Sequence, residues 1–137
     1  MMWSLLRRSR KQAFVPPAAL DRSLSPDEDA ALRWILWLED FPGSDELRVQ
    51  VGNVRATWGR TTEMDLEVLD APPAPMSNGY LPVVALVVGP NEEPTGDIQV
   101  SVVAGYLAQL SYSWFTDVMP TEYPSPDRLR LWDPSTG

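Results

Sequence analysis

Residues 98–115, with the sequence IQVSVVAGYLAQLSYSWF, decide how this chain folds. Two runs rich in β-branched and aromatic residues, 98–103 and 106–115, flank the dipeptide Ala104-Gly105. A two-residue hairpin turn needs positive φ angles, which glycine adopts readily, and the flanking runs have strand composition. The stretch therefore predicts a tight antiparallel hairpin at the centre of a sheet.

The second run of this hairpin carries a cluster of aromatic residues. Tyr106, Tyr112 and Trp114 share one parity, so a regular strand would turn all three towards one face. Packing of that face under a helix is the favoured interpretation, because large aromatic side chains dominate core burial. The alternative is an exposed anchor for a protein partner, formed by Tyr112 and Trp114.

Further strands are predicted on both sides of the hairpin. Residues 54–58 and 64–68 alternate apolar and polar side chains and predict a second hairpin with one solvated face. Residues 80–88 are almost entirely apolar, which is typical of a central strand. In the proline-rich tail, only residues 129–132 could pair with a sheet edge.

The stretch SPDEDAALRWILWLED, residues 25–40, predicts one long helix. Ser25 and Glu28 have the spacing of a capping box, with proline at the first helical position. Trp34 and Trp37 widen the apolar stripe beyond the face that one packing surface can cover. At least one tryptophan should be buried, and the other could mark a partner surface or a homodimer interface.

The expected fold is α+β, with one long helix packed on a mainly antiparallel sheet of about five strands in a single two-layer domain. This domain is expected to span residues 25–137, with residues 1–24 as a flexible, basic, proline-containing arm. Residues 44–51 fit either a serine-capped helical turn or a short alternating strand, and we favour the helix.

Charge is unevenly distributed along the 137 residues. Residues 1–22 carry a net charge of +4 and the remaining residues −12, which gives the overall −8. An acidic body repels nucleic acid and membrane surfaces, so the expected partner is a basic protein. Positive charge follows the short apolar opening instead of preceding it, so no export signal is predicted and a cytoplasmic location is expected.

The chain contains no histidine, no cysteine and a single lysine, Lys11. These residue types supply most general bases, nucleophiles and metal ligands, so we expect no catalytic residues, no cofactor and no metal site. Asp65 and Glu67 lie about 7 Å apart along one predicted strand, a spacing found in glycosidase carboxylate pairs. A solvated strand face explains the two acids more simply.

Several short motifs resemble those of a group of small bacterial proteins frequent in actinomycete-type genomes. The motifs are Phe41-Pro42-Gly43 followed by Glu46-Leu47-Arg48 and Gln50, then Gly105-Tyr106-Leu107 with Leu110 and Tyr112, and Pro120-Thr121-Glu122-Tyr123-Pro124 with Pro126 and Leu129. The resemblance implies a helix-plus-sheet domain and supplies no activity. Similar proteins often have glutamate where this chain has Ser111. Such short acidic proteins also resemble, at the level of fold alone, immunity proteins that neutralise toxins.

Two functions follow from these observations. The leading one is a non-enzymatic interaction domain, an acidic inhibitor or immunity-like binder of a basic protein. The alternative is a small-ligand-binding domain with its site between the sheet and the C-terminal tail, and a carboxylate-based hydrolase ranks third. The candidate partner-binding residues are Trp34, Trp37, Tyr112, Trp114, Asp117, Glu122 and Tyr123.

Overall fold

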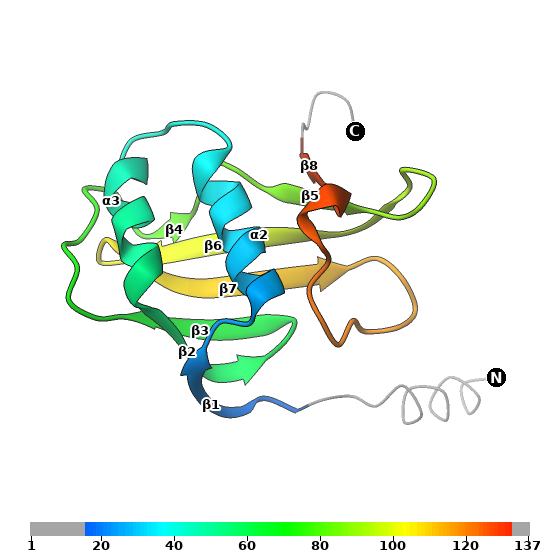
Figure 1. The fold of residues 1–137 in the computed structure, drawn as a ribbon, viewed down its shortest axis with the longest axis horizontal. Coiled ribbons are helices and arrows are strands. Elements are labelled where there is room, and N and C mark those ends of the chain that lie inside the picture. The colour runs from blue at the N-terminus through cyan, green and yellow to red at the C-terminus, as the bar shows by residue number, and fades with distance from the viewer. Residues whose placement is uncertain (1–15, 133–137) are drawn as a thin grey trace.

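The structure is a computed structural model that describes residues 16–132. Its centre is one antiparallel sheet in the order β1-β2-β3-β7-β6-β5-β8, with β4 paired to β6 (Figure 1). The strands are β1 (Ala18–Ser23), β2 (Val54–Arg60), β3 (Glu63–Val68), β4 (Gly79–Tyr80), β5 (Ala85–Val88), β6 (Pro94–Val103), β7 (Tyr106–Trp114) and β8 (Leu129–Leu131). The helices are α2 (Pro26–Trp37) and α3 (Ser44–Gln50), with the 3₁₀ turns η1 (Val51–Asn53) and η2 (Pro126–Arg128).

The predicted architecture of one long helix on about five strands is wrong. The sheet has 8 strands, and the helices are short, with 12 residues in α2 and 7 in α3. The sequence does not predict β4 as a separate strand, because its 2 residues are too few to show a period, or β1, which lies in the predicted arm. The prediction that residues 129–132 could pair with a sheet edge is confirmed, because β8 pairs with β5. The expected central strand at 80–88 is also divided: Tyr80 ends β4, and β5 begins at Ala85 and lies between β6 and β8.

Part of the predicted arm belongs to the sheet. Residues 18–23 form β1, which pairs with β2 from Ala18 opposite Gly59 to Ser23 opposite Arg55. Residues 1–15 of that arm lie outside the described residues. Within residues 16–132, no helix is both long and apolar enough to cross a membrane.

The start of α2 confirms the capping box. The Glu28 amide donates to Ser25 Oγ at 3.2 Å, and the Ser25 amide donates to Glu28 Oε1 at 2.8 Å. Two of the backbone donors at the helix start are thereby satisfied. The local sequence alone fixes where this helix begins.

The end of α2 depends on a residue from the next helix. Arg48 of α3 donates from Nε to the Leu36 carbonyl at 2.7 Å and from Nη2 to the Glu39 carbonyl at 3.2 Å. Carbonyls at a helix end have no partner within the helix, so this guanidinium satisfies that of Leu36, and it also binds a carbonyl two residues beyond the helix end. The contact requires α3, and the helical interpretation of residues 44–51 is confirmed.

Both predicted hairpins are present. Ala104 and Gly105 form the β6–β7 turn with φ angles of +54° and +84°, as a two-residue turn requires. One extra residue in β7, Ala108, shifts the register: Val102 faces Leu107 and Ser101 faces Gln109. Such a bulge reverses the side-chain alternation. Tyr106 therefore does not share the buried face of Tyr112, and the predicted common face of the aromatic residues is wrong.

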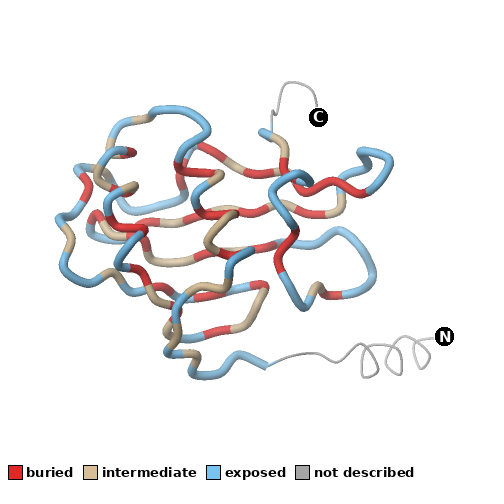
Figure 2. Tube along the Cα trace, in the orientation of Figure 1, coloured by how far each residue is buried: buried red, intermediate tan, exposed pale blue. Residues whose placement is uncertain are grey.

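The two helices cover one face of the sheet and form the core with it (Figures 1 and 2). Buried and half-buried residues alternate along β6, so the opposite face of this strand is open. The core joins apolar residues of both layers, among them Leu32, Ile35, Leu36, Leu47, Met64, Val87, Ile98, Val100, Leu107 and Leu110.

One buried polar side chain joins α3 to the β6–β7 hairpin. Gln50 is fully buried and donates from Nε2 to the carbonyls of Gly105 at 2.9 Å and Pro72 at 3.0 Å. Its Oε1 accepts from the Leu107 amide at 3.0 Å. Every donor and one acceptor position of the amide is used, so the hairpin turn is held in one place.

Candidate functional site

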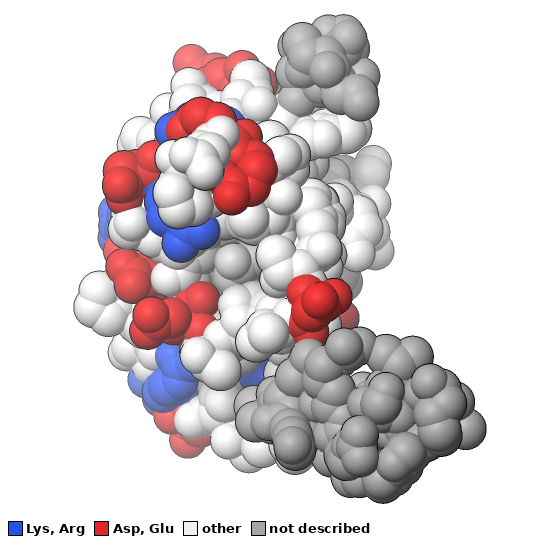
Figure 3. Space-filling view, turned by 90° about the vertical axis from the view of Figure 1, so that its right-hand side faces the viewer, with Lys and Arg blue, Asp and Glu red and all other residues white. Residues whose placement is uncertain are grey.

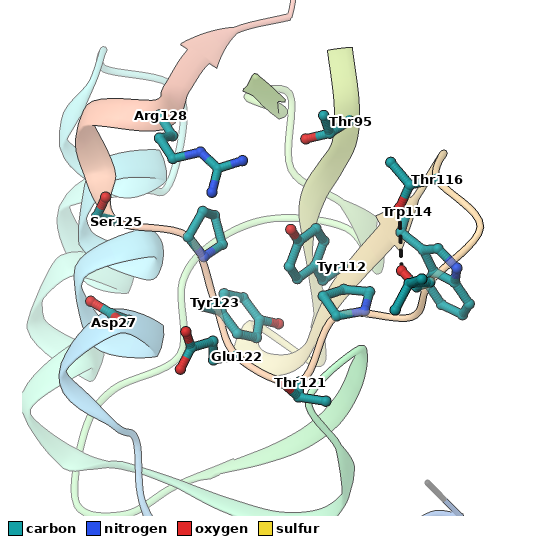
Figure 4. Close-up of a pocket in the computed structure, with 13 residues that line it drawn as sticks. Asp27, Thr95, Tyr112, Trp114, Thr116, Thr121, Glu122, Tyr123, Ser125 and Arg128 are labelled. Atoms are coloured by element: carbon teal, nitrogen blue, oxygen red, sulfur yellow. Dashed lines mark hydrogen bonds between the residues drawn. The ribbon is translucent and has the colours of Figure 1, made fainter. Parts of the chain in front are cut away.

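A pocket of about 500 Å³ lies between the sheet and the segment that follows β7. We call it the tail pocket. One wall comes from the adjacent ends of β6 and β7, the other from residues 116–128, and the first turn of α2 borders it (Figure 4). Its lining includes Asp27, Thr95, Tyr112, Trp114, Glu122, Tyr123 and Arg128.

Two tyrosines form the inner part of the tail pocket. The rings of Tyr112 and Tyr123 lie 5.3 Å apart, centroid to centroid, with their planes tilted by 56°. This is a favourable tilted geometry for an aromatic pair. Tyr123 is 3% exposed, and its hydroxyl has no hydrogen-bond partner among the described residues. It points towards the side of the pocket where Tyr112 and Thr121 lie (Figure 4).

Both phenols stay protonated over the physiological range. Burial raises the pKa of the Tyr123 hydroxyl far above its usual value, and the negative charge of Glu28 adds to this effect. Burial also raises the pKa of Tyr112, although the positive charge of Arg128 works against it. Each hydroxyl can therefore serve as a hydrogen-bond donor, and neither is poised as a general base.

Arg128 brings a positive charge to the pocket. It belongs to η2, and its Nε donates to the Val88 carbonyl at 2.9 Å, which fixes the side chain across the sheet edge. Its guanidinium extends towards Tyr112 (Figure 4). Within residues 16–132 it forms no ion pair with a carboxylate.

The loop at the pocket mouth exposes large apolar side chains. We call residues 115–122 the rim loop. Phe115 is 56% exposed and Val118 60% exposed, and the acids Asp117 and Glu122 lie on the same loop. Acidic side chains also cover more of this end of the molecule than basic ones do (Figure 3).

The turn between β2 and β3 contacts the rim loop through two threonine side chains. Thr61 Oγ1 donates to the Thr121 carbonyl at 3.1 Å, and Thr62 Oγ1 lies 4.0 Å from the sulfur of buried Met119. The Thr62 carbonyl also accepts from the Tyr112 amide at 2.8 Å. The loop is thus attached through Met119 and Thr121 to the β2–β3 turn.

The structure brings together five of the seven candidate residues. Tyr112, Trp114, Glu122 and Tyr123 line the tail pocket, and Asp117 lies on its rim loop. The two remaining candidates, both on α2, do not line this pocket.

Trp34 and Trp37 have different environments on α2. Trp34 is half-buried and packs against the core, whereas Trp37 is 49% exposed. The guanidinium carbons of Arg33 and Arg48 lie 5.6 and 5.7 Å from the centre of the Trp37 ring. Its exposed indole is therefore partly covered by two cations, a cation–π arrangement.

Sequence reasoning missed Arg128, Asp27 and Thr95. Asp27 suits the positive end of α2 and Thr95 lies near the start of β6, so residue type and position do not mark either as a site residue. Arg128 had a signal, because residues 61–127 contain no basic residue and Arg128 ends that interval. A single basic residue at the end of a long acidic stretch is a candidate for binding an anion.

The carboxylate pair weighed for hydrolysis lies elsewhere. Asp65 and Glu67 are exposed on β3, and Asp65 accepts from Gln109 Nε2 at 3.3 Å. Neither lines the tail pocket. The described part of the chain contains no group of three or more carboxylates placed to hold a metal ion.

The tail pocket thus combines two phenols, one guanidinium and an indole, with Asp27 and Glu122 also in its lining. These groups can bind a ligand by hydrogen bonds, charge and ring contact. No protein-family model matches the chain, and comparisons with curated proteins and with solved structures find no significant match. The resemblance to small actinomycete-type proteins therefore stays a prediction.

Proposed function

We propose that this chain is a non-enzymatic interaction domain that binds a basic partner protein through its rim loop. The observation that carries the proposal is the exposure of Phe115 and Val118, 56% and 60%, next to the acids Asp117 and Glu122. Apolar side chains surrounded by charge are typical of the energetic centre of a protein interface.

The charge of the chain supports a basic partner. The net charge is −8, and acids lie on and beside the rim loop. A field of one sign accelerates encounter with a surface of the other sign and disfavours nucleic acid. The small size and acidity of the chain fit an inhibitory or immunity-like form of this proposal, acting in the cytoplasm.

The rim loop is built to present its side chains in a fixed geometry. Phe115 begins the loop with its amide bonded to the Thr95 carbonyl at 2.9 Å, and Thr61 holds Thr121 at the other end. A loop fixed at both ends loses little conformational entropy on binding. This favours a binding surface over a solvated connection.

The test is capture of a partner by variants of the full chain. The double variant Phe115→Ser/Val118→Ser is compared with the parent and with Val103→Ser, which alters a residue of similar exposure, 53%, at the other end of β6. We expect one basic protein to bind the parent and Val103→Ser, to be lost from the double variant, and to dissociate as salt rises.

Two results would contradict the proposal. The double variant could retain the same partner as the parent, which would place the interface elsewhere. The chain could instead bind only a second copy of itself, which light scattering would show as a doubled mass that the double variant abolishes.

A further inference from the structure

The tail pocket has features that the rim loop does not need. Its volume of about 500 Å³ is in the range of small-molecule sites. The rings of Tyr112, Trp114 and Tyr123 form part of its lining, beside polar and charged side chains. Rings that line a pocket favour a flat apolar body, which can lie against their faces.

The guanidinium of Arg128 supplies the charge that selects the ligand. Nε is used by the Val88 carbonyl, and the group reaches towards Tyr112 without a carboxylate partner in residues 16–132 (Figure 4). A planar guanidinium binds a carboxylate through two parallel hydrogen bonds. The nearest phenol, Tyr112, can donate a further hydrogen bond to the same group.

Tyr123 provides a second, independent indication of a ligand. Its side chain lines the pocket, is more than nine-tenths buried, and its hydroxyl has no partner among the described residues. Buried hydroxyls are nearly always hydrogen-bonded, because a donor without a partner is costly. A bound polar group would satisfy it.

From these observations we propose that the tail pocket binds a small organic acid with one carboxylate on a flat apolar body. The carboxylate pairs with Arg128 and the body lies against the aromatic rings. Asp27 and Glu122 also line the pocket, so a doubly charged phosphate is repelled more strongly than a singly charged carboxylate. The inference concerns the pocket interior, whose lining shares Val118 and Glu122 with the rim loop, and its tests use small probes instead of a protein partner.

The first experiment compares four probes of similar size on the full chain by calorimetry and thermal shift. Benzoate carries the proposed carboxylate, phenyl phosphate a doubly charged anion, benzamide no charge, and benzylamine a cation. We expect benzoate to raise the melting temperature and to bind at least about tenfold more tightly than the other three, which is the usual loss when a charge pair is removed.

The second experiment uses variants with a matched control. Arg128→Gln should weaken benzoate binding about tenfold or more, whereas Arg130→Gln should leave it unchanged, because Arg130 is paired with Glu92 at 2.7 Å. Tyr123→Phe should weaken benzoate binding while leaving the melting temperature of the free protein equal or higher. If Tyr123 served only the fold, Tyr123→Phe would lower the melting temperature of the free protein and leave benzoate binding unchanged.

Three results would overturn the inference. Benzoate could fail to bind at about 10 mM, a concentration that detects even weak sites. Benzylamine could bind more tightly than benzoate, which would assign the pocket to its two carboxylates. Benzoate could bind parent and Arg128→Gln equally. The probe series on the parent chain decides the question even where Arg128→Gln lowers stability, and none of these results bears on the rim loop.

Discussion

Arg22 and Glu28 form a two-point ion pair that joins the first strand to the first turn of α2. Nη1 lies 2.8 Å from Oε1 and Nη2 lies 3.1 Å from Oε2. The same Oε1 accepts the Ser25 amide of the capping box. One buried carboxylate therefore holds both a strand and a helix start, with a side chain that is only 7% exposed.

Removal of Arg22 should destabilise the fold. In Arg22→Ala the Glu28 carboxylate stays buried with only its Ser25 contacts, and we expect a loss of about 1–3 kcal/mol in the free energy of unfolding. Arg33→Ala is the control, because it removes only exposed contacts, the pair with Asp29 and the cation–π contact with Trp37, and should cost under about 1 kcal/mol. Chemical denaturation measures both, and equal losses would contradict the role of the Arg22 pair.

Stability should depend on pH through Glu28. Burial tends to raise the pKa of this carboxyl, but the hydrogen bonds from Arg22 and the Ser25 amide outweigh it and hold the pKa below 4.5. A lowered folded pKa means that the contribution is complete above about 4.5 and is lost as pH falls through the folded value. As pH falls below 4.5, the melting temperature of the parent should therefore decrease more steeply than that of Glu28→Gln. Parallel curves would exclude the linkage.

Gln50 should tolerate no replacement. In Gln50→Leu the Leu107 amide and the Pro72 carbonyl lose their side-chain partner, and the Gly105 carbonyl keeps only the Ala74 amide, which should cost about 3 kcal/mol. Gln50→Glu keeps the shape and one acceptor but cannot donate when ionised, so it should be as damaging at neutral pH and partly restored by acid. Val49→Ala, at an exposed neighbour, is the control. A stable Gln50→Leu variant would show that the hairpin turn does not need the hydrogen bonds of the Gln50 side chain.

The two tryptophans of α2 should respond differently to truncation. Trp34 packs against the core, so Trp34→Ala should cost about 2–4 kcal/mol. Trp37 is 49% exposed and contacts two guanidinium groups, so Trp37→Ala should cost about 1 kcal/mol or less. Melting and light scattering on both variants check this. A drop in mass for Trp37→Ala alone would identify that indole as a dimer contact.

Local signals in the sequence were sufficient for the features that a few neighbouring residues determine. The capping box at Ser25 and the turn at Ala104-Gly105 depend on side-chain hydrogen bonds and φ preferences within four residues. The alternating pattern of β3 likewise reflects one buried face. In β2 the predicted alternation holds for Val54 and Ala56 only, because the register shift after Ala56 leaves Trp58 49% exposed.

Other features depend on contacts that the local sequence does not record. β1 is a strand because β2 offers it a free edge, and the bulge at Ala108 is visible only in the register against β6. The candidate site shows the same limit. Its tyrosines could be selected by residue type, but Arg128 joins them only because β8 brings η2 back to the edge of β5.

The support of the rim loop by the β2–β3 turn has a consequence for mutational scanning. The buried Thr62 side chain contacts Met119, and a Cβ at Gly96 would lie 2.5 Å from the Ser113 carbonyl and 3.0 Å from the Tyr112 ring. In a scan scored by binding alone, positions 62 and 96 will rank with the residues that contact the ligand. A parallel scan for abundance will separate them, because their losses will appear in both readouts whereas those of Arg128 will appear in one.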